Sequence, residues 1–221
     1  MRWRRLRDRP MVRRASQAPV AWTLIFINVV WFFTVEAWTG LSPEGTLRAG
    51  ALYAPAVAAG EWYRLVSDMF VHMSLLHLMM NMISLASLAV MEVLLGSAAF
   101  FALYWLAGVA GSLVSLVFLP DGVVGGASAA IFGVFGAALM LALRGVLSRA
   151  ARNQLLALLI VNLVYGWAAP NVAVAAHLGG LVAGAGLAWP LYAGWFPRTG
   201  VRAMAVLCAG FTAVALGAVL A

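Results

Sequence analysis

The chain has 221 residues, of which 65% are hydrophobic and 10% are charged, and its mean hydropathy is +0.99. This balance excludes a soluble globular domain and indicates a membrane protein with several spans. The formal net charge is +7, and all fourteen basic residues are arginine. Because these arginines stand between apolar runs, we interpret the charge as an orientation signal, and we expect no nucleic-acid partner.

Seven apolar runs predict seven transmembrane helices. A helix of about 20 apolar residues crosses a hydrocarbon core of about 30 Å, and most of the runs approach that length. The runs lie at 20–39, 75–95, 98–119, 128–143, 153–169, 173–195 and 202–220. The first run carries bulky aromatic residues and lacks a small-residue cleavage site, so we interpret it as a retained span and not as a signal peptide. The sequence therefore predicts an all-α membrane protein embedded in the lipid bilayer.

The arginines predict the orientation of these spans. Seven of them precede the first run, in an Arg-rich tail over residues 1–19. Three more (Arg144, Arg149 and Arg152) separate the fourth and fifth runs, and two (Arg198 and Arg202) precede the seventh. Since basic loops stay inside, we expect a cytoplasmic N-terminus and an external C-terminus. The tail is also suited to contact anionic lipid head groups.

The fourth run is short for a complete span. Its 16 residues from Ser128 to Leu143 cover roughly 24 Å as a helix, less than the hydrocarbon thickness. Its first residue must then start below the external surface, and the preceding "LPDGVVGG" must dip inward. Irregular backbone at that depth is tolerated where protein or a wet cavity satisfies its amides. We therefore expect Ser128 on the floor of an externally open, hydrated pocket.

A histidine of the sixth run is expected at a similar depth. His177, Gly180 and Gly184 share one nearly bare helix face, and the fourth run offers Gly133, Gly136 and Ala137 as its counterpart. Small residues allow two helix backbones to approach closely, which would bring the serine hydroxyl within reach of the imidazole. Phe132, one turn after Ser128, is placed to pack against that ring. Taken alone, such a histidine is more often a hydrogen-bonded structural residue, so the prediction depends on the coincidence in depth.

These residues suit acyl transfer by a serine–histidine dyad. A serine becomes nucleophilic when a neighbouring base takes its proton. His77 and Asn81 are four residues apart at the start of the second run, hence on one face, and could donate to a developing oxyanion or form a polar clamp between helices. Glu92 lies about fifteen residues beyond His77, too deep for a third member, so we expect a structural hydrogen-bonding role over a proton relay.

Other chemistries have less support in the sequence. His72 lies off the face of His77 and Asn81, and we expect it to anchor a loop. The histidines lack an H-E-x-x-H motif and a carboxylate at ligand spacing, so we predict no metal site. The single cysteine, Cys208, excludes an internal disulfide.

Three motifs in this order resemble the rhomboid family of intramembrane serine proteases. They are "GEWYRLVSDMFVHMSLLHLMMNM" at 60–82, "GGASAAIFG" at 125–133 and "AAHLGGLVAG" at 175–184. The resemblance implies six core transmembrane helices over 20–195, forming the catalytic domain, and an additional C-terminal helix over 196–221. It also implies Ser128 as nucleophile, His177 as general base and then acid, and His77 with Asn81 near the oxyanion.

The resemblance implies supporting residues and a substrate class as well. Tyr63 and Arg64 match a pair that holds the external loop, and Glu92 matches a structural glutamate of the second helix. The implied activity is cleavage of single-span membrane proteins within or beside their transmembrane segment, without a cofactor. The short layout without further domains suggests a bacterial plasma membrane. The family usually has glycine directly after the serine, whereas Ala129 stands here, and its methyl group could crowd the oxyanion pocket.

Two other functions remain open from the sequence. The first is an inactive relative that captures membrane helices without hydrolysis, although such relatives generally lose the serine or the histidine, and both are present here. The second is a transporter. That function calls for ionisable residues or broken helices at the bilayer midplane, whereas the conspicuous break precedes Ser128 on the external side.

Overall fold

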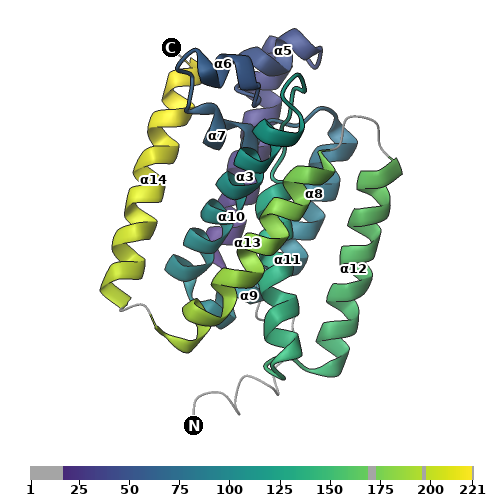
Figure 1. Ribbon diagram of the computed structural model, residues 1–221, viewed down its shortest axis with the longest axis vertical. Helices are drawn as coiled ribbons and strands as arrows, with labels where there is room; N and C mark the ends of the chain where they lie inside the picture. Colours follow the sequence, from purple (N-terminus) through teal and green to yellow (C-terminus); the bar gives the residue numbers. More distant parts are fainter. Residues whose placement is uncertain (1–16, 169–172, 196–197, 221) are drawn as a thin grey trace.

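The computed structural model describes residues 17–168, 173–195 and 198–220, so most of the Arg-rich tail lies outside the described residues. The described chain is helical, with one isolated β-bridge between Leu52 and Val124 (Figure 1). Helix α3 (Pro19–Trp31) continues through the π-helical turn η1 (Phe32–Glu36) into α4 (Ala37–Thr39), and α8 (Leu75–Leu88) is followed by the short α9 (Val90–Leu95). The other long helices are α10 (Ser97–Phe118), α11 (Ser128–Leu143), α12 (Arg149–Ala168), α13 (Val174–Ala193) and α14 (Arg198–Leu220).

The all-α prediction is confirmed, and each of the seven predicted runs contains a described helix. Five stretches of the described chain are long and apolar enough to cross a membrane, at 19–39, 75–95, 97–118, 174–193 and 198–220, while α11 is shorter and α12 is not among the five. The fifth helix begins at Arg149, four residues before its predicted start, and the seventh begins at Arg198. Arginine is a good helix former, and an arginine in the first turn of a helix can point to the polar side of the interface.

Helices α10, α11 and α13 form the centre of the bundle, with α12 and α14 at opposite sides (Figure 1). Glycines allow the close approach of α11 and α13. A β-carbon on Gly184 would meet the backbone of Gly133, and one on Gly180 would meet the backbone of Ala129. The two helices therefore touch through their main chains, as the small-residue pattern predicts.

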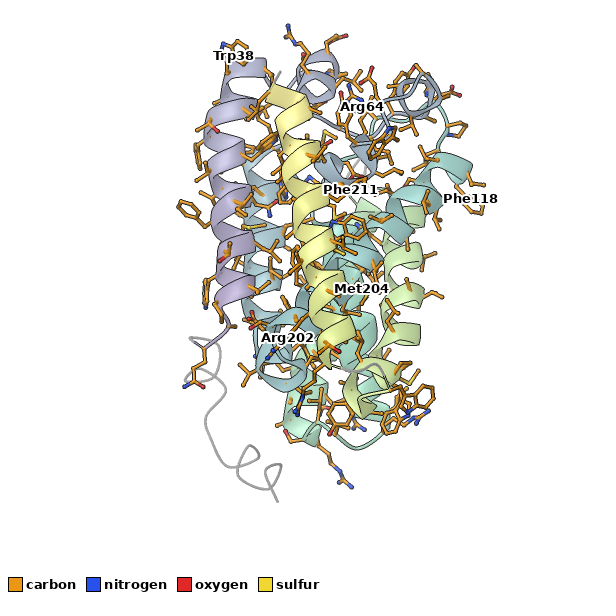
Figure 2. All side chains as sticks on the ribbon, turned by 90° about the vertical axis from the view of Figure 1, so that its left-hand side faces the viewer. Trp38, Arg64, Phe118, Arg202, Met204 and Phe211 are labelled. Carbon is orange, nitrogen blue, oxygen red and sulfur yellow. The ribbon has the colours of Figure 1, made fainter. Side chains whose placement is uncertain are left out.

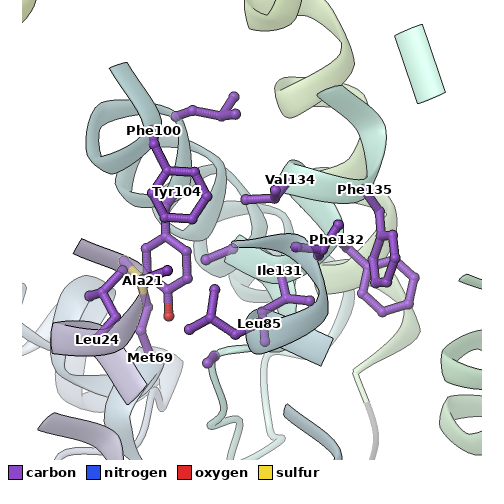
Figure 3. Packing of buried hydrophobic residues seen from close by; sticks show 14 of the residues in the cluster. Ala21, Leu24, Met69, Leu85, Phe100, Tyr104, Ile131, Phe132, Val134 and Phe135 are labelled. Carbon is purple, nitrogen blue, oxygen red and sulfur yellow. The ribbon is translucent and has the colours of Figure 1, made fainter. Parts of the chain in front are cut away.

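A large apolar cluster fills the space around this centre. Figure 3 shows Tyr104 and Phe100 of α10 packed near Leu85 of α8 and Ile131 of α11, and all four side chains are at most 1% exposed. Such a packed interior fixes the relative positions of helices that carry polar side chains.

The segment between α4 and α8 is ordered by short helices at one end of the bundle. These are α5 (Pro43–Arg48), α6 (Ala54–Ala58), α7 (Arg64–Ser67) and the 3₁₀ turn η2 (Asp68–Phe70). Helix α5 starts with a Ser42 side chain that accepts the Gly45 N–H and with proline at its first position, a favourable start. Figure 2 shows Arg64 at this end and Arg202 toward the other end of α14.

Helix α14 lies along α10 and reaches this segment. The Trp105 indole N–H donates to the Thr212 hydroxyl over 3.1 Å, and the Phe211 ring packs between Trp105 and Trp62, with centroid distances of 5.8 and 4.9 Å. Phe211 of α14 is visible in Figure 2. Aromatic pairs of this kind contribute about 0.5 to 1.5 kcal/mol beyond their buried area.

Candidate active site

The loop before α11 is held by the segment that follows α5. Leu52 and Val124 exchange both backbone hydrogen bonds, and the Gly126 N–H donates to the Asp68 carbonyl over 2.8 Å. Gly126 has a φ of +129°, a conformation that favours glycine. These bonds satisfy irregular backbone next to the helix and place Ser128 at the first turn of α11.

Ser128 and His177 meet across the α11–α13 contact. The Ser128 Oγ lies 2.7 Å from the His177 Nε2, within hydrogen-bond distance. The Phe132 ring stacks on the imidazole, with centroids 4.2 Å apart and an interplanar angle of 6°. His177 is 5% exposed. The main-chain approach at Gly180 and Gly184 thus brings a hydroxyl and an imidazole together, and Phe132 limits the rotation of the ring.

His77 and Asn81 lie on the facing helix, α8. Ser74 caps this helix by accepting the His77 N–H, which fixes His77 in the first turn. A β-carbon on Gly126 would lie 2.9 Å from the His77 Nε2 and 3.7 Å from the Asn81 Nδ2, so both side chains border the backbone before Ser128. The Asn81 Nδ2 donates to the His77 carbonyl over 3.2 Å, and its second N–H is available for another acceptor.

A pocket with about 270 Å³ of empty space joins these groups. It is lined by His77, Met80, Asn81, Ser128, Phe132, Asn162 and His177. Ala129 does not line it. A β-carbon on Gly111 of α10 would meet the Ala129 methyl carbon, and Ala129 clusters with Ala173 and Ala176. The Ala129 methyl group therefore points toward α10 and α13, away from the pocket that it was expected to crowd.

Tyr63 and Arg64 brace the segment between α4 and α8. The Arg64 guanidinium donates to the carbonyls of Leu47 and Ala51 over 2.7 and 2.8 Å, and it pairs with Glu61. The Tyr63 hydroxyl also donates to Glu61, over 2.9 Å. Hydrogen bonds from Tyr63 and Arg64 lower the pKa of Glu61, so this carboxylate stays charged and keeps both donors in place.

Glu92 belongs to α9 and does not line the pocket; its side chain contacts the first turn of α3. Its carboxylate accepts the N–H groups of Val20 and Ala21 over 3.1 and 2.8 Å, and the Ser97 hydroxyl over 2.6 Å. The first N–H groups of a helix have no partner within the helix, and a carboxylate there satisfies them and complements the helix dipole. Glu92 thus joins α3, α9 and α10.

Three buried polar residues near the site were missed by reasoning from the sequence. The Asn162 side chain of α12 lines the pocket and accepts the Ser84 hydroxyl over 3.0 Å. The Asp68 carboxyl accepts the Ser112 hydroxyl over 2.8 Å, and burial raises its pKa to about 7. Glu36 of η1 accepts the His72 N–H over 2.9 Å. Asn162 is a lone polar residue in an apolar stretch, a costly placement that could have drawn attention.

His72 anchors its loop beneath the pocket. Its side chain is 0% exposed, and its Nδ1–H donates to the Phe70 carbonyl over 3.2 Å. The ring lies edge-on to the His77 ring at a centroid distance of 5.2 Å. Burial lowers the pKa of His72 to about 3, so its ring is neutral. Among the described residues, no group of three or more His, Cys, Asp or Glu side chains could hold a metal ion.

The comparisons with known proteins agree with this arrangement. The Rhomboid domain family model matches residues 59–194, more than half of the chain. The chain therefore belongs to the rhomboid family, and it is a multi-pass membrane protein. The matched range includes the serine, both pocket histidines and the asparagine described above.

The chain is also similar in sequence to particular members of the family. The chain is 36% identical over 164 residues to the rhomboid protease GluP of Bacillus subtilis (strain 168), which covers 72% of this chain and 32% of that relative. It is 32% identical over 170 residues to the putative rhomboid protease YdcA of the same strain, covering 75% of this chain and 84% of that relative. RHOMBOID-like protein 5 of Arabidopsis thaliana is 39% identical over 147 residues, or 63% of this chain and 47% of the relative. The aligned part thus spans about a third of the length of GluP.

Proposed function

We propose that this protein is an intramembrane serine endopeptidase that works through a Ser128–His177 dyad. The observation that carries the proposal is the 2.7 Å separation of the Ser128 Oγ and the His177 Nε2 in a pocket near one end of the bundle. Membership of the rhomboid family and the protease names of two relatives support it. A structural serine–histidine hydrogen bond would not require the two donors of α8 beside the same pocket.

In the first step, the His177 Nε2 accepts the Ser128 proton while the Oγ attacks the carbonyl carbon of the scissile peptide bond. The bond to nitrogen then breaks, and the protonated His177 gives its proton to the leaving amine. Water follows, losing a proton to His177 as it attacks the acyl-enzyme ester, and the proton returns to the Ser128 Oγ when the acid product leaves. Phe132 keeps the imidazole facing the Oγ throughout.

The negative oxygen of each tetrahedral intermediate needs hydrogen-bond donors. His77 and Asn81 supply side-chain N–H groups from α8, and the Ser128 backbone N–H points from the start of α11. The His72 ring lies edge-on behind the His77 ring, and a neutral His77 ring can donate through one nitrogen. Removal of one such donor typically costs about 2.7 to 4 kcal/mol of transition-state stabilisation.

Single-span membrane proteins are the proposed substrates. The pocket is bordered by helices and by the backbone before Ser128, so a substrate has to present an extended stretch of chain. A transmembrane helix that unwinds near its external end, with small side chains before the cleaved bond, meets this requirement. Residues 20–195 would then form the catalytic domain and 196–221 an additional span, in a bacterial plasma membrane with the N-terminus cytoplasmic and the C-terminus external.

A serine-directed fluorophosphonate probe tests the dyad in membranes that contain the full chain. We expect labelling of the wild type, none of Ser128→Ala, and at least a hundredfold slower labelling of His177→Ala. Ser87→Ala is the matched control, because the Ser87 hydroxyl donates only within its own helix, to the Ile83 carbonyl. Labelling that persists in Ser128→Ala, or a wild type that stays unlabelled, would sink the proposal and favour a helix-binding protein without hydrolysis.

A further inference from the structure

A second pocket lies between α11 and α12, away from the dyad. It is a shallow depression, partly open at the surface, and it is lined by Phe135, Ala138, Leu139, Ala142, Arg152, Leu155, Leu156 and Leu159. We name it the α11–α12 groove. Ala142 is fourteen residues beyond Ser128 on the same helix, so this end of the groove lies about 21 Å from the serine along the helix axis. The groove is therefore separate from the candidate active site.

One side of the groove changes from polar to apolar along α12. The first six residues of α12, from 149 to 154, include Arg149, Arg152, Asn153 and Gln154, whereas leucines predominate from Leu155 onward. Arg152 shares a helix face with the three groove leucines of α12, which follow it by three, four and seven residues. This face carries the Arg152 guanidinium where the helix becomes apolar. The leucine side chains then extend over roughly the next 10 Å along the helix axis.

The Arg152 guanidinium is incompletely paired. Its Nε is buried and has no hydrogen-bond partner among the described residues. At the same end, the Arg144 guanidinium lies over the Trp189 ring, 4.3 Å from its centroid. No carboxylate is among the residues that line the groove. A buried cationic donor beside apolar surface favours an anionic ligand with an apolar body.

We propose that the α11–α12 groove binds one anionic phospholipid. The lipid phosphate accepts the N–H of Arg152, and an acyl chain lies against Leu155, Leu159 and Phe135. Charge complementarity identifies the ligand class, because the groove joins a guanidinium to an apolar wall where α12 changes from polar to apolar residues. Basic pockets between transmembrane helices are known to bind such head groups, and the aromatic–arginine pair at Trp189 fits the same interfacial level.

The bound lipid would stabilise the placement of α12. This helix stands at the edge of the bundle and packs chiefly on α11 (Figure 1), and the groove lies in that contact. Farther along α12, Asn162 lines the candidate active site and accepts the Ser84 hydroxyl. A lipid between α11 and α12 therefore holds the helix that supplies one wall of the other pocket. This inference rests on the groove alone and does not require the proposed protease activity.

Native mass spectrometry of the full chain tests the proposal. The protein, in a mild detergent, is offered equal amounts of phosphatidylglycerol and phosphatidylcholine with identical chains. We expect the wild type to retain phosphatidylglycerol at least fivefold over phosphatidylcholine, since one basic residue near anionic lipid contributes about 1 kcal/mol. Arg152→Gln should bring the ratio close to one, and Arg152→Lys should restore most of it. Arg149→Gln, an exposed arginine of the same first turn, is the matched control and should keep the preference.

A second variant covers the case in which Arg152→Gln does not fold. Ala142→Leu keeps the guanidinium and fills the groove with a larger side chain, so we expect it to lose at least half of the retained phosphatidylglycerol. Glycerol 1-phosphate should not displace the lipid, whereas a site for free phosphate would release it. Equal retention of both lipids by the wild type, equal losses in the two glutamine variants, or a lipid-free dimer would overturn the proposal.

Discussion

The contact between α11 and α13 gives a quantitative prediction at Gly184. In Gly184→Ala the new methyl group would meet the carbonyl oxygen, carbonyl carbon and Cα of Gly133, all main-chain atoms that cannot rotate away. The helices must separate by roughly 1 to 2 Å to restore ordinary contacts of about 3.5 to 4.0 Å. We expect a loss of about 1 to 3 kcal/mol in the free energy of unfolding, the usual cost of overpacking.

The same separation would pull His177 from Ser128, because α13 carries both Gly184 and the histidine. Fluorophosphonate labelling at a temperature where the variant is folded should therefore slow at least tenfold. Gly186→Ala is the control on the same helix, since a β-carbon there meets no atom within 4 Å. Stability is measured by thermal unfolding in detergent. If Gly184→Ala unfolded at the temperature of Gly186→Ala and was labelled at the same rate, the close-contact argument would be refuted.

Three further predictions concern single side chains. Phe132→Leu keeps an apolar side chain but removes the stacking on His177, so labelling of the folded variant should slow about tenfold, and the smaller buried side chain should also lower the unfolding temperature; equal labelling rates would contradict a positioning role. Glu92→Gln should lower stability by about 1 kcal/mol through weaker bonds to the start of α3, with labelling of the folded protein unchanged. Burial raises the pKa of Asp68 from its ordinary 3.8 to about 7 in the folded state. The folded state therefore holds the proton more tightly than the unfolded chain, and this residue makes stability fall as pH rises between those values. Burial lowers the pKa of His72 to about 3, so this residue makes stability rise with pH up to about pH 6.5. In Asp68→Asn the opposing effect of Asp68 is gone, and stability should rise more steeply with pH over the same window. Thermal unfolding at several pH values measures this slope.

The sequence predicts the helices and the central contact well, for a physical reason. Long apolar runs have few alternatives to helix in a membrane, and small residues at three- and four-residue spacing mark the face where two helices can touch. The pairing of Ser128 with His177 follows from that face and from the short fourth run. Phe132 could be placed for the same reason, as it lies one turn from the serine on the same helix.

The buried polar residues around the site could not be predicted in this way. Glu36 reaches His72 through a π-helical turn, and Asp68 reaches Ser112 from a 3₁₀ turn between spans, so neither follows the regular helix spacing used for the other residues. Asn162 was inside a predicted span, but its partner Ser84 is 78 residues away in the chain. The direction of the Ala129 methyl group likewise depends on how α10 crosses α11. Such details depend on the rotation of each helix about its axis, which apolar periodicity alone leaves loosely defined.

Cleavage of a single-span membrane protein tests the central claim most directly. The full chain and a doubly tagged single-span substrate with small residues near its external end would be reconstituted in the same vesicles, and the fragments would be identified by mass. Our account predicts one cut within or beside the transmembrane segment by the wild type, and intact substrate with Ser128→Ala or His177→Ala of unchanged unfolding temperature. Equal cutting by wild type and Ser128→Ala would contradict it.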